Sequence, residues 1–65
     1  MHEYELRILN FDHTLSMSML TMQMSASMAI RTAQKMAEGK PFEVWRGDDR
    51  MYAHEGRKRI SRPAA

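Results

Sequence analysis

The chain has 65 residues, a mass of 7.6 kDa and no cysteine. These values leave room for one small domain and exclude a two-domain enzyme, disulfide bonds and thiolate chemistry. The net charge of +2 conceals two opposed parts: residues 1–55 carry six basic and eight acidic side chains, whereas residues 56–65 carry four basic and no acidic ones. We therefore expect a folded domain at 1–55 and a disordered basic tail at 56–65.

The composition also indicates where the protein works. Apolar residues are 43% of the chain and charged residues 28%, which is typical of a folded soluble domain. No stretch approaches about 18 consecutive apolar residues, and the N-terminus, Met-His-Glu-Tyr-Glu, does not resemble a signal peptide. We expect a cytoplasmic protein that makes no membrane contact.

The first predicted element is a strand. Residues 4–11 contain no glycine or proline, and Tyr4, Leu6 and Ile8 alternate with Glu5 and Arg7. A turn follows at residues 12–14, because an aspartate side chain hydrogen-bonds readily to backbone two residues further on.

Residues 15–24 can be interpreted in two ways. Their apolar residues stand at 15, 17 and 19 and then at 20, 22 and 24, which is a period of two with one phase slip. We predict a strand with a bulge near Leu20 that absorbs the slip. Methionine and leucine also favour helices, so the alternative is one long helix from about Leu15 to Glu38, which would give a β-α-β-β fold.

A helix is predicted from a cap at Ser25 or Ser27 to Glu38. Gly39 is expected to take the left-handed conformation at its end, and Pro41 prevents its continuation. Small and apolar residues share one side of this helix, namely Ala26, Ala29, Ile30, Ala33, Met36 and Ala37.

Two further strands are expected at 42–45 and 50–54, on either side of a turn at 46–49 that contains Gly47. The sequence thus predicts an α+β class domain of the order β-β-α-β-β, that is, hairpin, helix, hairpin.

The run from Ala29 through Gly39, Pro41, Val44 and Trp45 to residue 47 resembles short uncharacterised proteins of α-proteobacteria. In these an alanine-rich helix with a basic residue after Ala-Ile ends in glycine and leads into a strand of the Val-Trp type. The resemblance covers about residues 25–54. It implies a β-β-α-β-β or β-α-β-β arrangement and no particular activity, and residues 15–24 depart from its pattern.

The methionines suggest an interface. If residues 15–24 form a strand, apolar side chains occupy both of its faces, and one helix on one face cannot bury them all. We expect a homodimer, the simplest use of such a patch, and a further protein partner is compatible with it. The candidate interface residues are Leu15, Met17, Met19, Leu20, Met22 and Met24.

Copper is a competing hypothesis for the same residues. Thioethers bind Cu(I), and residues two apart on a strand share a face. Met17, Met19, Met22, Met24 and Met28 would be the ligands, but methionine more often fills cores and interfaces.

The tail suggests a different partner. Arg57, Lys58, Arg59 and Arg62 could neutralise phosphates, which makes weak nucleic-acid binding the alternative function. Trp45 and Tyr52 could add base stacking.

Catalytic signals are weak. His2, His13 and His54 are far apart in the sequence, and Asp48 and Asp49 lie in a predicted turn. We expect a non-enzymatic protein that uses no metal and no cofactor.

Overall fold

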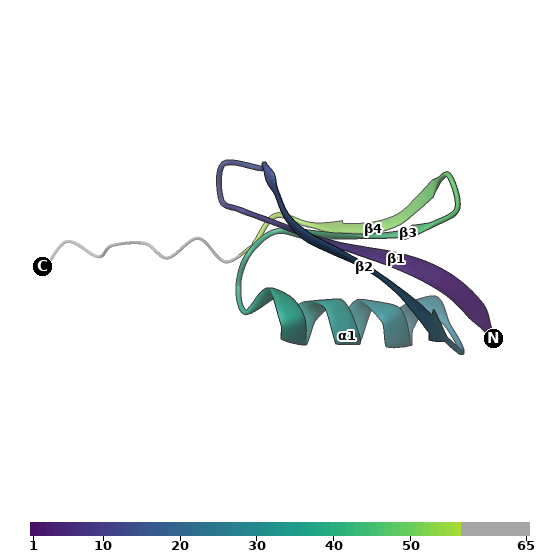
Figure 1. Cartoon of the computed structure of the whole chain (residues 1–65). Helices are drawn as coiled ribbons and strands as arrows, with labels where there is room; N and C mark the ends of the chain where they lie inside the picture. Colours follow the sequence, from purple (N-terminus) through teal and green to yellow (C-terminus); the bar gives the residue numbers. More distant parts are fainter. Residues whose placement is uncertain (57–65) are drawn as a thin grey trace, which may run out of the picture.

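The computed structural model describes residues 1–56, which form four strands and one helix (Figure 1). In chain order these are β1 (His2–Leu9), β2 (Leu15–Gln23), α1 (Ala26–Ala37), β3 (Phe42–Arg46) and β4 (Asp49–His54). The predicted β-β-α-β-β order is confirmed. The alternative with one long helix is wrong, because residues 15–23 form the strand β2, which pairs with β1.

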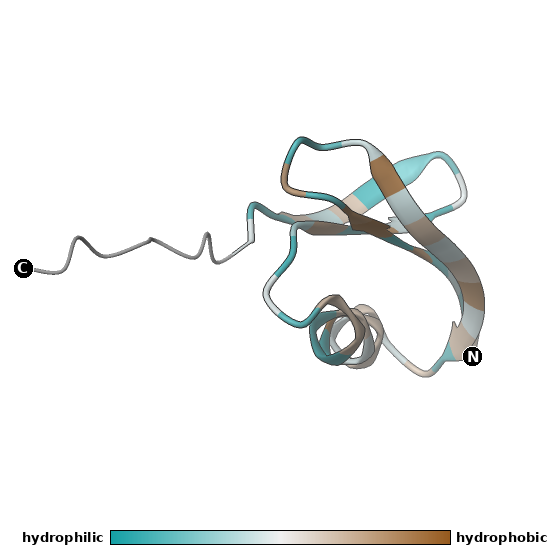
Figure 2. Cartoon of the chain, turned by 60° about the vertical axis from the view of Figure 1, so that its left-hand side comes forward, coloured by the Kyte–Doolittle hydropathy of each residue, from teal (hydrophilic) through white to brown (hydrophobic). Residues whose placement is uncertain are grey.

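The strands form one antiparallel sheet of order β2-β1-β3-β4. α1 connects β2 to β3 and lies on one face of the sheet (Figure 2). We call this the helix-side face; no described residue covers the other face, which we call the open face. Within residues 1–56 no helix is long and apolar enough to span a membrane.

The core lies between α1 and the two central strands. Leu6 on β1 and Val44 on β3 are completely buried, and so are Ala29 and Ala33 on α1. Because alanine is small, the helix can approach the sheet closely, and the larger side chains of the core come from the strands. The core cluster consists of Tyr4, Leu6, Ile8, Ala29, Ala33, Ala37, Phe42 and Val44, and Pro41 is buried as well.

The first hairpin turns earlier than the sequence predicts. β1 spans residues 2–9, not 4–11, because Asn10 bonds to Thr14 through its backbone N–H (2.8 Å to the carbonyl) and its side chain (2.9 Å to Oγ1). Phe11 therefore lies exposed in the turn. The predicted role of Asp12 is confirmed, since its Oδ1 accepts the Thr14 backbone N–H at 3.0 Å.

The bulge predicted near Leu20 is not present. Residues 17–23 pair continuously with β1, and the register shifts instead opposite Ile8 and Leu9, where Ser16 is left without a partner. The apolar pattern changes phase without a bulge because the methionines before the slip lie on one face of β2 and the apolar side chains after it lie on the other. The strand also ends at Gln23, so Met24 lies beyond it.

Ser25 caps the helix: its side-chain oxygen accepts the Met28 backbone N–H at 3.3 Å. The helix ends at Ala37 rather than at Glu38, because Glu38 itself takes a left-handed conformation (φ 50°) and Gly39 follows with φ 92°.

The second hairpin is tighter than predicted. β3 extends to Arg46 and β4 begins at Asp49, so only Gly47 and Asp48 form the turn, with φ 62° at Gly47. Gly56, assigned to the tail by its sequence, lies against Pro41: a Cβ there would be 2.7 Å from the proline nitrogen. The rest of the predicted tail lies outside the described residues.

Candidate functional site

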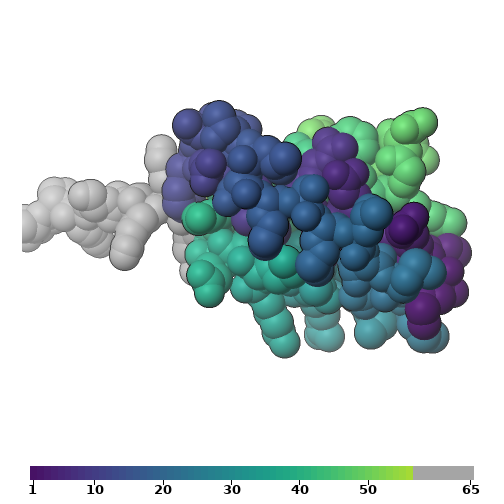
Figure 3. Space-filling view, viewed as in Figure 1, coloured from purple at the N-terminus to yellow at the C-terminus, as the bar shows by residue number. Residues whose placement is uncertain are grey.

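β2 is the most exposed apolar element of the fold. It is an edge strand, and among the described strands it pairs with β1 alone. None of its nine residues is charged. In a space-filling view its atoms (blue) form much of the front surface above the helix (Figure 3).

Five of the six candidate interface residues are exposed, and the sixth, Met19, is half-buried against the core. The exposed fractions are 57% for Leu15, 42% for Met17, 64% for Leu20, 54% for Met22 and 66% for Met24. Five large apolar side chains with such high exposed fractions within ten residues are unusual on the surface of a monomeric protein.

The strand register divides these residues between the two faces of the sheet. Met19 lies opposite the buried Leu6, which places it on the helix-side face, and Met17 follows on the same side. Leu20 lies opposite Glu5 and therefore on the open face, and Met22 joins it there. β2 thus presents apolar side chains on both sides of one free edge.

This division argues against the copper hypothesis. Met17 and Met19 project from one face and Met22 from the other, while Met24 lies beyond the strand. The methionines of β2 therefore do not converge as one thioether site. No cluster of three or more His, Asp or Glu side chains suited to a metal ion occurs within residues 1–56.

Polar side chains cross the centre of the open face. The Arg7 guanidinium lies 4.5 Å above the Trp45 ring and is hydrogen-bonded to both oxygens of Glu5 at 3.1 Å. These hydrogen bonds raise the pKa of Arg7 above its ordinary value. The Trp45 Nε1–H donates to Glu43 at 2.8 Å, and Arg50 reaches the other oxygen of that carboxylate at 3.4 Å.

These residues were not predicted to form one group. The signal was present, because residues 5 and 7 alternate with the buried residues of β1 and residues 43 and 45 alternate with those of β3. Only the pairing of β1 with β3, which places Glu5 opposite Trp45 and Arg7 opposite Glu43, joins them into one group.

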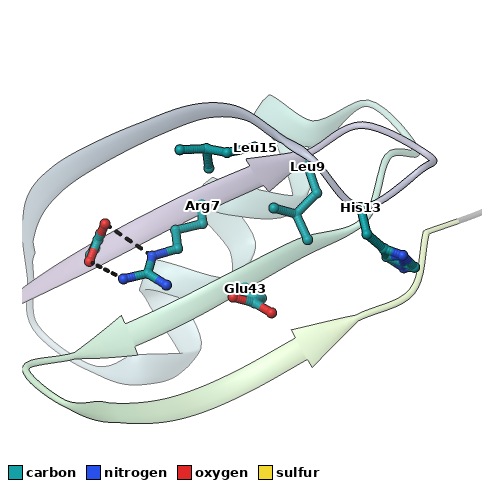
Figure 4. A pocket seen from close by; sticks show the side chains of 6 residues that line it. Arg7, Leu9, His13, Leu15 and Glu43 are labelled. Carbon is teal, nitrogen blue, oxygen red and sulfur yellow. Dashed lines mark hydrogen bonds and ion pairs between the residues drawn. The ribbon is translucent and has the colours of Figure 1, made fainter.

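A shallow hollow of about 440 Å³ lies beside this group (Figure 4). Its lining residues are Glu5, Arg7, Leu9, His13, Leu15 and Glu43. Both carboxylates already accept hydrogen bonds from protein donors. The arrangement therefore stiffens a surface and does not present a free acid and base pair.

The predicted stacking pair is divided between the two faces. Trp45 lies on the open face, whereas Tyr52 lies opposite Val44 on the helix-side face. There the Tyr52 ring packs against Phe42 at 5.7 Å between centroids, and His54 stacks on Phe42 at 5.2 Å. Trp45 and Tyr52 therefore do not form a common platform for bases. The four cations predicted to contact nucleic acid, residues 57, 58, 59 and 62, lie outside the described residues.

The other predicted polar residues are dispersed. Arg46 Nη2 is hydrogen-bonded to His2 Nδ1 at 3.1 Å. His13 lies in the first turn, and His54 Nδ1 accepts the Gly56 backbone N–H at 2.9 Å. Asp48 belongs to the second turn and Asp49 begins β4. None of these brings a nucleophile and a base together.

Comparison with known proteins adds no assignment: no family model, curated protein or solved structure matches this chain. Its function must be inferred from its own residues, and β2 is the feature that sets this surface apart.

Proposed function

We propose that this chain is a small, non-enzymatic interaction module that forms a homodimer through β2. The observation that carries the proposal is the row of exposed, uncharged side chains on this strand, with Leu20 and Met22 on one face and Met17 on the other. A second copy would remove these side chains from water, which is the main driving force of protein association.

The small core supports the same proposal. Chains of about 60 residues bury only about 60% of their unfolded surface, so many gain stability from oligomerisation, disulfides or metals. This chain has no cysteine, and its helix contributes three alanines as its buried residues. Burial of β2 between two copies would extend the core beyond one chain.

A symmetric dimer also fits the distribution of charge. All charged side chains of residues 1–56 lie outside residues 15–24, so two copies of β2 can meet without bringing like charges together. A two-fold axis uses the same patch on each copy, so no second complementary surface is required.

The test is the molar mass of the full 65-residue chain in solution, measured by light scattering during size-exclusion chromatography from about 1 μM to about 1 mM. The expected result is a concentration-dependent change from one to two chains. A molar mass of one chain across this range would overturn the proposal.

A further inference from the structure

The two edges of the sheet differ in how they are protected. β4 begins with the charged residues Asp49 and Arg50, has six residues and faces a register shift between Val44 and Trp45 on its neighbour. Charges, short length and irregularity all prevent an edge from pairing with another chain. β2 has nine residues, no charge and no proline. Its one irregularity, at Ser16, lies near one end of the strand and leaves residues 17–23 regular.

The backbone of β2 is oriented for such pairing. In β1, the Leu9 N–H bonds to the Pro41 carbonyl at 2.8 Å, on the β3 side. Backbone groups alternate in direction along an antiparallel strand, so Leu6 and Ile8 direct theirs toward β2. Met19 and Met17, which pair with Leu6 and Ile8, direct their N–H and C=O groups toward β1.

The intervening residues of β2 are Ser18, Leu20 and Met22. By the same alternation their N–H and C=O groups point away from β1, to the free edge of the sheet. These groups can bond with solvent in a single chain or with another strand in a complex.

From these features we infer that β2 of one chain pairs antiparallel with β2 of a second chain, so that two four-stranded sheets become one eight-stranded sheet. The inference rests on the proposed homodimer and specifies its geometry. The occupant is a second copy because it brings an edge of the same length, the same lack of charge and the same alternation of exposed apolar side chains.

The regular part of the strand fixes the register. Residues 17–23 pair with β1 without interruption, whereas Ser16 is irregular. A two-fold axis through Leu20, the centre of 17–23, pairs this whole span with itself. Leu20 then meets the partner's Leu20 across the axis, and Met19 lies opposite the partner's Thr21.

The size of this contact is sufficient for a modest dimer. A nine-residue strand is about 30 Å long, and a sheet with one helix layer is about 20 Å deep. The edge therefore offers at most roughly 600 Å² on each chain, which is the lower end of the range of specific interfaces.

Amide hydrogen exchange of the unmodified full chain tests the pairing. We expect the N–H groups of Ser18, Leu20 and Met22 to exchange at least roughly tenfold more slowly at millimolar than at low micromolar concentration. The N–H groups of Met17 and Met19, which face β1, serve as the internal control and should be protected at both concentrations. If the chain is dimeric but the amides of Ser18, Leu20 and Met22 still exchange rapidly, the edge pairing is wrong and the proposed function stands.

Disulfide trapping tests the register, since the native chain has no cysteine. Met19→Cys and Thr21→Cys chains should become cross-linked when mixed under mild oxidation, because opposed residues of this kind have Cα atoms about 4.5 Å apart. Met19→Cys alone should not become cross-linked, because the two copies of residue 19 would be diagonal neighbours with Cα atoms about 7–8 Å apart. Met51→Cys, on β4, is the control for random collisions.

The outcomes are distinct once light scattering has shown that the variants are dimeric. Cross-linking confined to the mixture supports the axis through Leu20. Cross-linking of Met19→Cys alone overturns that axis. If no pair on β2 is linked more than the Met51→Cys control, the edge pairing itself is wrong.

Discussion

Leu20→Lys is the most informative single change. Leu20 is 64% exposed in one chain, so the substitution removes no core contact and should change the stability of the isolated domain by no more than about 0.5 kcal/mol. In the dimer the same side chain lies at the two-fold axis. Complete burial of a leucine contributes about 1.5–3 kcal/mol. The open face stays in water in the eight-stranded sheet, so the part of Leu20 that the partner strand shields contributes about 0.5–1 kcal/mol in each chain.

Two-fold symmetry doubles this loss. We expect Leu20→Lys to weaken the dimer by about 1–2 kcal/mol, which is about tenfold in Kd, and the two ammonium groups at the axis would add repulsion. Leu20→Ala should weaken the dimer less, because it removes apolar surface without adding charge.

The assay is sedimentation equilibrium at several concentrations, with urea denaturation of each variant to confirm that its fold is intact. Met51→Lys is the matched control, because Met51 is 42% exposed on the opposite edge strand and the change in charge is the same. If Leu20→Lys and Met51→Lys change Kd equally, the effect comes from net charge and the assignment of the interface to β2 is refuted.

Two further predictions concern the fold itself. Gly39 (φ 92°) and Gly56 (φ 87°) have similar φ angles, but only a Cβ at residue 56 meets Pro41. Gly56→Ala should therefore lower the free energy of unfolding by about 1 kcal/mol more than Gly39→Ala in urea denaturation, and equal losses would contradict this contact. Hydrogen bonds from Thr14 lower the pKa of the Asp12 carboxyl, so this carboxylate contributes stability above its unfolded pKa and loses it as the pH falls through the lowered value. Thr14→Val removes the hydroxyl donor and should raise the pKa of Asp12 toward its ordinary value in an NMR titration; an unchanged pKa would show that the hydroxyl is unimportant.

Most of the fold could be predicted because β1 and α1 each have one buried side. In β1 the alternation of Leu6 and Ile8 with Glu5 and Arg7 matches the pleat, and the alanines of α1 recur at helical spacing. Such patterns arise wherever one face meets a core and the other meets water. The caps were predictable for a similar reason, since Ser25 offers an oxygen to a backbone N–H that has no partner within the helix.

β2 could be predicted only in part, because its sequence does not distinguish its two faces. Met19 and Leu20 are both apolar, but one packs against the core and the other is exposed. Hydrophobicity alone therefore suggested a bulge, where the structure has an unbroken register. The contact of Arg7 with Trp45 could not be predicted from local pattern at all, since it depends on which strands are neighbours and in what register.

The exposed apolar edge follows from the proportions of the domain. An α-helix is about 10 Å wide and adjacent strands are about 4.8 Å apart, so one helix covers about two strands of a sheet. Here the buried alanines of α1 pack with side chains of the central strands β1 and β3, which leaves the edge strands only partly covered. On β2 the helix side reaches Met19 and Gln23 but leaves Met17 exposed. β4 covers its own helix-side surface by packing Tyr52 and His54 against Phe42. β2 has no aromatic residue for this purpose, and its flexible thioethers are suited to an adaptable contact with another surface. A second copy of β2 would close the free edge and shield the flanks of its apolar side chains, which a single 12-residue helix cannot do.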